Sequence, residues 1–352
     1  MKRPPKNGET SQKIFRTLLI DANALFKIGF HGSINEYNHH GQPIGGVYQF
    51  LTVLGNLLKN ELYHRVYVFW DGKYSGKLRY NHYVDYKANR NKDYINGTQP
   101  VDESEQIQKA KIWNYLEDLC IRQVRNDIVE GDDFIAYYCL TAEENEEISI
   151  CTNDRDMCQL IDEKVRIYFC DLREYITLEN YNTRFKHHQS NSMLIKMICG
   201  DTADNIKGIK GVKEKTLLEH FPELTERPVT LDEILTKARV IQENRSLKKL
   251  KPLKGLDNLI NAVTDGIQGN KIYEINEILV NLKKPLMTET AIESLNNLRS
   301  GYFDLEERSI KDVFKQLKID GIDRLMNNTT YSEYLLPFKK LIEREQKQLK
   351  TI

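Results

Sequence analysis

Five short apolar runs alternate with segments of helical periodicity in the first half of the chain. The runs lie at residues 15–20, 66–70, 124–129, 148–151 and 165–170, and they have the length and composition of buried β-strands. Between them, residues 46–60 and the segment that begins at Ser104 place apolar side chains on one helical face. This alternation predicts an α/β fold with a mostly parallel sheet and helices on both faces.

After about residue 190 the strand signals fade and helical periodicity dominates. The polar N-terminal residues are expected to be disordered, because they offer almost no apolar surface to bury. The predicted units are a disordered segment at 1–13, an α/β domain at 14–189, a helical hairpin region at 190–222 and a helical C-terminal region at 223–352.

Nine carboxylates stand at a few places along the chain, most of them directly after a predicted strand. They are Asp21, Asp71, Glu130, Asp132, Asp133, Asp154, Asp156, Asp201 and Asp204. Because α/β sheets bind ligands beyond the carboxyl ends of their strands, we expect these acids to converge. So many like charges need cations, and oxygen ligands without His or Cys favour Mg²⁺, with Mn²⁺ as a substitute. The pattern predicts two-metal phosphodiester chemistry, as in a nuclease.

Each acid by itself has a simpler interpretation. Acids at a helix start are favourable caps that contribute up to about 1 kcal/mol. Asp154 and Asp156, on either side of Arg155, are compatible with a cap and a surface salt bridge. The run at 130–133 places three acids in four residues, which is more than capping needs. The metal interpretation therefore rests on the recurrence of the same placement.

Composition limits the class of protein. The chain has 352 residues, of which 40% are hydrophobic and 29% charged, and its mean hydropathy is −0.56. No apolar run reaches the roughly 18 residues of a membrane span, and no apolar stretch follows the basic N-terminus as in a secretory signal. We therefore expect a cytoplasmic protein whose six cysteines are reduced.

The formal charge is balanced, with 51 basic and 51 acidic residues, but the basic residues are unevenly placed. Residues 73–92 hold six basic residues against one acid, 207–215 hold four lysines against Glu214, and 245–254 hold five cations and no acid. Local patches of this kind bind phosphate whatever the total charge. The run at 245–254 has two interpretations, a solvated surface segment or a strip that extends a duplex-binding track.

Residues 200–216 are the most specific single stretch, Gly-Asp-Thr-Ala-Asp-Asn-Ile-Lys-Gly-Ile-Lys-Gly-Val-Lys-Glu-Lys-Thr. Gly208 and Gly211 permit a tight turn and a close approach to phosphate, and Lys213 and Lys215 stand at the start of the next helix. Such a pattern is typical of a helix-hairpin-helix that holds a duplex by its backbone. The alternative, an ordinary glycine-rich turn, is weakened by the neighbouring acids.

Three tyrosines and two histidine pairs each have a structural interpretation beside a functional one. Tyr80, Tyr83 and Tyr86 are three residues apart, a spacing that suits either packing against the core or stacking on unpaired bases. The histidine pairs at 39–40 and 187–188 are expected at the solvated surface, because no cysteine supports a zinc site beside them.

The order of these blocks resembles the flap endonuclease or 5′-nuclease superfamily, which includes the nuclease domain of bacterial DNA polymerase I and the phage 5′→3′ exonucleases. The blocks are the two strand-end aspartates, Tyr-Lys-Ala-Asn-Arg at 86–90, Val-Glu-Gly-Asp-Asp at 129–133, Thr-Asn-Asp-Arg-Asp at 152–156 and the stretch at 200–212. The resemblance implies a PIN-like sheet, a helical arch at about 73–103 and a helix–three-turn–helix at 190–222. The helical tail to residue 352, including the stretch from 284 to 325, resembles the ribonuclease H of T-even phages.

The resemblance also implies roles for individual residues. Asp21, Asp71, Glu130 and Asp132, with Asp133 beside them, match a first metal group, and Asp154, Asp156 and Asp201, with Asp204 outside them, match a second. Lys87 and Arg90 match arch residues that neutralise the scissile phosphate, and Arg79 lies near the base of the arch as a DNA contact. Lys207, Gly208, Lys210, Gly211, Lys213 and Lys215 match the duplex-binding motif, where relatives hold a monovalent cation, here K⁺, through backbone carbonyls.

The function implied is that of a structure-specific 5′→3′ exonuclease and flap endonuclease that uses two Mg²⁺ ions. Its substrates would be DNA with a 5′ flap or 5′ end and RNA–DNA hybrids, during primer removal in the replication of a phage genome in the bacterial host cytoplasm. Expected partners are a single-stranded-DNA-binding protein or a sliding clamp, and no membrane. The alternatives are a PIN-type endoribonuclease, which is usually shorter and lacks the arch and hairpin, and a non-catalytic DNA-junction-binding module.

Overall fold

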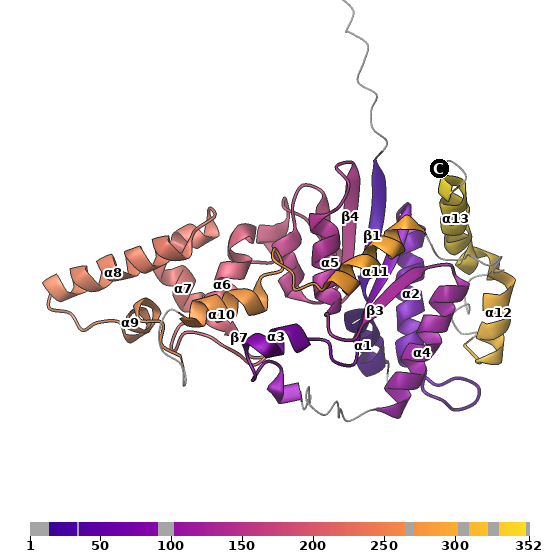
Figure 1. Ribbon diagram of the computed structural model, residues 1–352, viewed down its shortest axis with the longest axis horizontal. Coiled ribbons are helices and arrows are strands. Elements are labelled where there is room, and N and C mark those ends of the chain that lie inside the picture. Colours follow the sequence, from indigo (N-terminus) through magenta and orange to yellow (C-terminus); the bar gives the residue numbers. More distant parts are fainter. Residues whose placement is uncertain are drawn as a thin grey trace, which may run out of the picture.

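A six-stranded sheet forms the centre of the protein (Figure 1). The computed structural model describes residues 14–33, 35–90, 102–264, 271–301, 310–322 and 331–349. The strands are β1 (Phe15–Asp21), β2 (Arg65–Asp71), β3 (Arg122–Asn126), β4 (Glu146–Thr152), β5 (Val165–Phe169) and β6 (Glu174–Ile176), in the order β3-β2-β1-β4-β5-β6. The expected disorder at 1–13 lies outside the described residues.

The first five strands are parallel, and β6 pairs antiparallel with β5. The predicted α/β class with a mostly parallel sheet is therefore confirmed, and β6 is a strand that its short, half-polar sequence did not reveal. Residues Thr17 to Asp21 of β1 are fully or almost fully buried, as expected for a strand covered on both faces. Parallel strands bring their carboxyl ends to one edge of the sheet.

Helices cover both faces of this sheet. One face packs against α1 (Ala22–Gly32), α2 (Gly45–Asn60) and α4 (Glu103–Asp118), whose buried side chains include Leu25, Leu51 and Ile112. The other face packs against α5 (Gly131–Leu140), the short helix η2 (Arg155–Leu160) and α11 (Glu289–Ser300). The two apolar clusters lie on opposite faces because successive side chains along a strand alternate.

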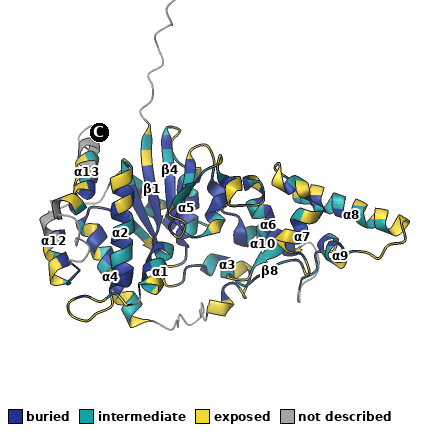
Figure 2. Ribbon diagram, turned by 180° about the vertical axis from the view of Figure 1, so that it is seen from behind, coloured by how far each residue is buried: buried dark blue, intermediate teal, exposed yellow. Residues whose placement is uncertain are grey.

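A third apolar cluster lies beside the sheet and holds a smaller helical region. Its elements are α3 (Lys77–His82), α6 (Ser192–Cys199), β7 (Gly200–Asp201), β8 (Ile206–Lys207), α7 (Glu214–His220), α8 (Leu231–Leu247), α9 (Lys254–Ile260) and α10 (Lys271–Val280). Figures 1 and 2 show α8 reaching away from the sheet, with exposed residues along its length. The molecule is consequently elongated.

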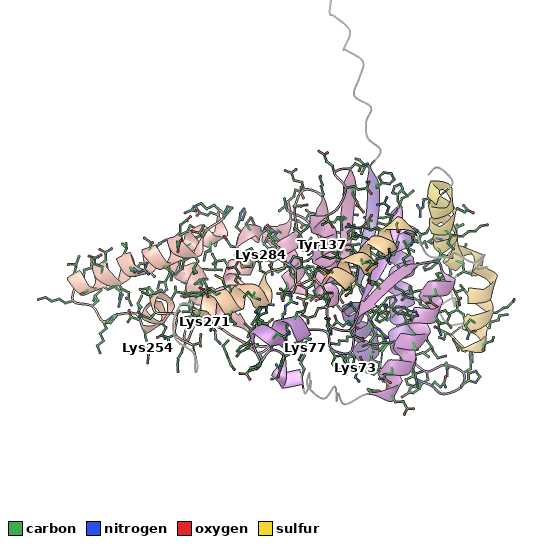
Figure 3. The ribbon with its side chains drawn as sticks, viewed as in Figure 1. Lys73, Lys77, Tyr137, Lys254, Lys271 and Lys284 are labelled. Carbon is green, nitrogen blue, oxygen red and sulfur yellow. The ribbon has the colours of Figure 1, made fainter. Side chains whose placement is uncertain are left out.

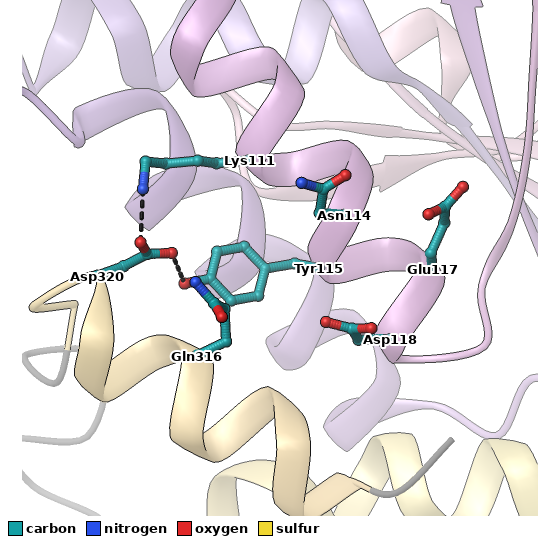
Figure 4. Close-up of a pocket in the computed structure, with 7 residues that line it drawn as sticks. All are labelled: Lys111, Asn114, Tyr115, Glu117, Asp118, Gln316 and Asp320. Atoms are coloured by element: carbon teal, nitrogen blue, oxygen red, sulfur yellow. Dashed lines mark hydrogen bonds and ion pairs between the residues drawn. The ribbon is translucent and has the colours of Figure 1, made fainter. Parts of the chain in front are cut away.

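The C-terminal region is distributed over all three clusters. Helix α10 belongs to the third cluster and α11 to the second, while α12 (Ile310–Ile319) and α13 (Tyr331–Leu349) pack against α4 and α2 in the first. A pocket of about 350 Å³ lies between α4 and α12, where Asp320 accepts hydrogen bonds from Lys111 and Tyr115, both at 2.6 Å (Figure 4). The described helices within residues 223–352 thus form a strap over the molecule rather than a separate body.

The six cysteines carry free thiols, three of them buried. In the described part of the chain, no helix is both long enough and apolar enough to cross a membrane.

Candidate active site

Three neighbouring strands carry acids to one edge of the sheet. Asp21 is the last residue of β1, Asp71 is the last residue of β2, and Asp154 follows β4 by two residues. Asp132 joins them from the first turn of α5. Burial raises the pKa of Asp132 well above its ordinary value, and the charges of Asp21, Asp154 and Asp71 raise it further. We call these four residues, which come from four separate segments, the carboxylate cluster.

Local hydrogen bonds fix the direction of these side chains. Asp21 accepts from the backbone N–H of Ala24 at 3.0 Å, as the cap of α1, and from the Thr152 hydroxyl at 2.8 Å. The same hydroxyl oxygen accepts from the backbone N–H of Asp154 at 2.9 Å. Thr152 therefore ties the ends of β1 and β4 together, a role that the sequence alone did not indicate.

The backbone N–H of Gly131 donates to Asp71 at 2.8 Å, which joins the end of β2 to the start of α5. The pKa of Asp21 is raised from 3.8 to about 6, first by burial and then by the charges of Asp71 and Asp154, against the lowering effect of its own hydrogen bonds. Raised pKa values at two of the four acids mean that negative charge at this edge is not fully compensated by protein groups.

The remaining predicted ligands have cationic partners. Glu130, the residue before α5, is bound by the Lys87 ammonium, by the Arg79 guanidinium at 2.6 Å and by the Tyr86 hydroxyl at 3.1 Å. Asp133 faces away from the carboxylate cluster: it binds Arg79 through both guanidinium nitrogens and accepts from the backbone N–H of Leu286 at 2.9 Å. Among the acids of this run, Asp132 alone belongs to the cluster.

The expectation that Arg79 contacts DNA does not agree with its position. Its side chain is only 4% exposed, and it is held by Glu130, by Asp133 and, at 2.9 Å, by the carbonyl oxygen of Leu279. Burial alone would lower the pKa of Arg79, but Asp133 and Glu130 raise it well above its ordinary value. Arg79 is an internal counter-ion that links α3, α5 and α10, because three separate acceptors surround it.

Asp156 and Asp201 share a lysine that sequence reasoning missed. The Lys196 ammonium, on α6, binds Asp156 and lies 2.7 Å from Asp201. Burial and the charge of Asp154 raise the pKa of Asp156 to about 7, although Lys196 opposes the shift. Burial alone would raise the pKa of Asp201, but Lys196 and backbone donors lower it. The predicted second group is thus divided, with Asp154 at the cluster and this pair around Lys196.

The segment that follows α3 docks on the residues around Asp204. The backbone N–H of Lys87 donates to the Asp204 carbonyl oxygen at 2.9 Å, and Arg90, in the short helix η1 (Ala88–Arg90), binds the Asp204 carboxylate. Asn89 donates to the carbonyl oxygen of Thr202 at 3.0 Å. Lys87 has a φ of 55°, which is costly for a residue with a side chain. The part of the predicted arch at 91–101 lies outside the described residues.

Lys87 is almost completely buried, with 7% of its surface exposed. Burial alone would lower its pKa, but Glu130 and Asp204 raise it well above the ordinary value, so the ammonium stays charged. Its ammonium also lies 4.9 Å from the centre of the Tyr86 ring. Lys87 thus stands between Glu130 and Asp204 as a fixed positive charge beside the carboxylate cluster.

The chemistry of these side chains fits divalent metal ions, but their present arrangement is not a coordination shell. In the described ranges, no group of three or more His, Cys, Asp or Glu side chains is placed to hold a metal ion. Several acids instead bind the cations Arg79, Lys87 and Lys196. The donors are all hard oxygens and the cluster is short of positive charge, which is the donor set that Mg²⁺ and Mn²⁺ prefer. Binding would require carboxylates to turn from ammonium groups to the ions.

The predicted hairpin is built on a two-residue ladder between β7 and β8. A Cβ added to Gly208 would lie 2.0 Å from the backbone oxygen of Cys199, so the close approach of the two backbones requires glycine there. Gly211 has a φ of 79°, a conformation that also favours glycine. The four predicted duplex-binding lysines, Lys207, Lys210, Lys213 and Lys215, are all exposed. The structure therefore has the exposed basic hairpin that the sequence predicted, whose contacts with DNA stay a prediction.

Two minor expectations are settled by burial. Tyr83 and Tyr86 pack into the third apolar cluster, which excludes base stacking by these two rings in this arrangement. His187 is buried rather than solvated, because it bonds Tyr181 at 2.9 Å and Glu214, on α7, at 3.0 Å. The surface expectation for His187 was wrong, since a local pattern does not reveal these partners.

Known proteins are similar to this chain in sequence and in fold. Residues 16–189 match the family model described as 5′-3′ exonuclease, N-terminal resolvase-like domain. A 5′-3′ exonuclease of Mycoplasmopsis pulmonis is 28% identical over 232 residues, which cover 62% of this chain and 70% of the relative. A 5′-3′ exonuclease of Bacillus subtilis is 24% identical over 328 residues, which cover 90% and 98%. The chain belongs to the flap endonuclease or 5′-nuclease superfamily.

Membership in this superfamily confirms the predicted enzyme class, a hydrolase of the 5′-3′ exonuclease and flap nuclease type. Enzymes of this superfamily generally depend on divalent metal ions. The chain spans about a quarter of the length of the DNA polymerase I relatives that it also matches, such as that of Thermus thermophilus at 24%. The 5′-exonuclease of bacteriophage T5, solved with zinc ions, shares the fold: its TM-score is 0.55 at 20% identity, over 88% of this chain and 100% of that one.

Proposed function

We propose that this 5′ nuclease is a structure-specific 5′→3′ exonuclease and flap endonuclease that works with two divalent metal ions, Mg²⁺ or Mn²⁺. The observation that carries this proposal is the carboxylate cluster, where three adjacent strands and one helix start deliver four acids to one edge of the sheet. A fold needs no such concentration of like charge for its stability, since like charges held close together repel and their desolvation costs free energy.

Asp21, Asp71, Asp132 and Asp154 would hold the ions, and Glu130, Asp156 and Asp201 would join them after release from Lys87, Arg79 and Lys196. When bound, two such ions supply an activated water and stabilise the leaving 3′-oxygen. Asp204 and Asp133 have cationic partners of their own and would stay outside the shell. Thr152 and the Gly131 N–H would keep Asp21 and Asp71 in position throughout.

Lys87 and Arg90 would act on the scissile phosphate. Both cations lie in the predicted arch. Lys87 binds Glu130, which the metal ions would take as a ligand, and Arg90 binds Asp204, which would lie beside the ions. Positive groups held beside a phosphoryl centre stabilise the charge that develops in the transition state. The exposed lysines of the hairpin would hold the duplex by its backbone, so that the 5′ strand reaches the cluster at a fixed register.

The expected substrates are DNA with a 5′ flap or 5′ end and RNA–DNA hybrids, which suit primer removal and flap trimming during replication. Relatives that are named DNA polymerase I support a replication setting. A phage source, the likeness of the tail to T-even ribonuclease H, a clamp or single-stranded-DNA-binding partner and K⁺ at the hairpin all stay predictions. A potassium-against-sodium titration of duplex binding would test the last.

The two alternatives have less support. A PIN-type endoribonuclease would explain the acids but not the hairpin with its exposed lysines. A non-catalytic junction-binding module would keep the hairpin but has no reason to bring four acids together, since burial and the neighbouring charges raise the pKa values of Asp21 and Asp132.

The decisive experiment compares the chain with its Asp132→Asn variant on a 5′-labelled flap and on single-stranded RNA. We expect Mg²⁺-dependent release of the flap by the parent chain, no release in EDTA, and no release by the variant at any Mg²⁺ concentration. The variant should still bind the flap, because Asp132 holds ions rather than DNA. Preferred cleavage of the RNA, or full activity of the variant, would contradict the proposal.

A further inference from the structure

The turn between α8 and α9 carries a group of lysines that the active site does not use. Lys248, Lys249, Lys251 and Lys254 are all exposed, and we call them the basic strip. Among the residues that the structure describes, none of these ammonium groups has a carboxylate partner. Four uncompensated charges within seven residues repel one another, which favours a polyanionic partner.

Side chains of α8 hold the backbone of this turn in place. The Arg245 guanidinium donates twice to the carbonyl oxygen of Lys251, at 2.9 and 2.7 Å. Gln242 donates to the carbonyl oxygen of Leu253 at 2.9 Å and accepts from its N–H at 3.0 Å. A turn fixed in this way loses little conformational freedom on binding, so more of the electrostatic attraction appears as affinity.

The basic strip is continuous with the hairpin. The backbone N–H of Lys210 donates to the carbonyl oxygen of Val263 at 2.9 Å, and Asn258, on α9, donates to the Lys210 carbonyl oxygen at 2.8 Å. A Cβ added to Gly255 would lie 3.1 Å from the Gly211 oxygen, so α9 begins directly against the hairpin turn. Gly255 is the seventh residue after Lys248, which limits the far end of the strip to about 24 Å from the hairpin.

Further cations, exposed except for the half-buried Lys77, lie between the strip and the active-site end of the molecule. Figure 3 shows Lys254, Lys271, Lys77 and Lys73 following one another along the long axis, from α9 to the loop after β2. Duplex DNA is an extended line of charge, with about one phosphate per 1.7 Å of axis. A line of cations matches such a partner better than it matches a compact anion.

We propose that the basic strip holds the phosphate backbone of the same duplex at a point beyond the hairpin, and thereby lengthens the footprint of the enzyme. This inference rests on the proposed function, and it assigns to the turn between α8 and α9 a contact that none of the site residues makes. The contact involves backbone charge alone, so it acts on affinity and not on the chemical step or on sequence preference.

The test replaces Lys248, Lys251 and Lys254 by Gln and keeps Lys249, whose φ of 54° makes its backbone sensitive to substitution. A matched control replaces Lys59, Lys164 and Lys340, which are equally exposed and lie outside the line of cations. Binding to uncleaved flaps is measured in EDTA over a salt series, with a downstream duplex of about 20 base pairs or of about 6, which spans only about 20 Å and so reaches less of the strip.

On the long duplex we expect the strip variant to bind about tenfold more weakly and its salt slope to fall by roughly 2 to 3, about one unit per lost contact. On the short duplex its loss of affinity should be clearly smaller, because fewer of the three lysines are within reach of the phosphates, and the control variant should bind like the parent on both. Single-turnover cleavage at saturating enzyme should be unchanged.

Unchanged affinity and slope on the long duplex would overturn the proposal, and so would an equal loss on both duplexes, which would assign the strip to another partner or to folding. Failure of the parent chain to cut any flap would instead contradict the proposed function. The two failures are therefore distinguishable.

Discussion

Lys87 joins two parts of the protein that are far apart in sequence. Its ammonium binds Glu130, next to the carboxylate cluster, and its backbone N–H binds Asp204, at the start of the hairpin. A conformation with positive φ at such a junction is kept only when the surroundings enforce it. The position of this charge is therefore built into the fold before substrate arrives.

We predict that Lys87→Ala lowers the single-turnover cleavage rate by about 100-fold or more, because its charge matters most for the transition state. Flap affinity should fall only a few-fold. Lys213→Ala, in the hairpin, should do the reverse: it should weaken duplex binding and reduce the salt slope by about one unit, with little change in rate at saturating enzyme. Equal effects of the two variants on the cleavage rate at saturating enzyme would show that Lys87 and Lys213 do not have separate roles in catalysis and in duplex binding.

The raised pKa of Asp21, about 6 against 3.8, predicts a pH dependence of stability. Between these two values the folded chain binds a proton that the unfolded chain has released, so stability is lost as pH rises through this window. The metal-free protein should lose on the order of 3 kcal/mol of unfolding free energy from this residue alone between about pH 4 and pH 7.

Thermal unfolding in EDTA across this pH range is the measurement, with Asp21→Asn as the comparison. The variant should show a flatter profile, and Mg²⁺ at neutral pH should raise the melting temperature of the parent more than that of the variant. If the stability of the metal-free parent increased from pH 4 to pH 7, or if both chains had parallel profiles, the pKa of Asp21 would not be raised in the folded protein.

Single acids could be located from the sequence because each follows an apolar run, and the end of a run is a local property. Their counter-ions could not. Lys196 lies 40 residues from Asp156, and Arg79 lies 54 residues from Asp133. Nothing local distinguishes a buried arginine from one that faces DNA, which is why Arg79 was assigned to the wrong environment.

Among the elements, the short β7–β8 ladder is the most sensitive to a single atom. It brings the end of α6 within reach of the hairpin turn, and Gly208 is the point of closest approach. Gly208→Ala would place its Cβ 2.0 Å from a backbone oxygen, which cannot move as a side chain can.

We predict that Gly208→Ala destabilises the protein by about 2 to 4 kcal/mol and weakens duplex binding, because the turn that presents the lysines must shift. Gly32→Ala, at the end of α1, is the matched control: a Cβ there meets nothing within 4 Å, so stability should stay the same or rise slightly. Urea unfolding and a duplex titration of both variants would check this. A well-folded Gly208→Ala chain with normal binding would mean that the ladder does not position the hairpin.

The succession of β1 to β5 and of the helices α2 and α4 along the chain followed from apolar periodicity, which is a local property of the sequence. The sequence did not reveal β6, which has three residues and one buried side chain. It also did not indicate that α8 projects from the body, because the apolar spacing of a helix does not show whether a partner covers it.

For the whole molecule, the decisive feature is the strap formed by the C-terminal segments. Phe338, on α13, is completely buried in the same cluster as Leu51 and Leu54 of α2. We predict that Phe338→Ala costs about 3 to 5 kcal/mol, whereas Lys340→Ala, at an exposed position of the same helix, changes stability by less than about 0.5 kcal/mol.

Urea unfolding followed by circular dichroism, with flap cleavage measured at each concentration, distinguishes a strap from an independent domain. A single transition that also ends cleavage is the expected outcome for both variants. An early transition that leaves cleavage intact would show that α12 and α13 form a separable unit.

The strap also means that some contacts of the N-terminal domain can form only late in translation. Tyr334 donates to the carbonyl oxygen of Leu51 across 283 residues of sequence, and Asn38 donates to that of Asp320 across 282. At about 5 to 20 residues per second, the ribosome releases one partner roughly 15 to 60 seconds before the other. Throughout that interval the side of α2 that packs against α13 has no native cover, so we expect the nascent chain to bind chaperones until α13 has emerged.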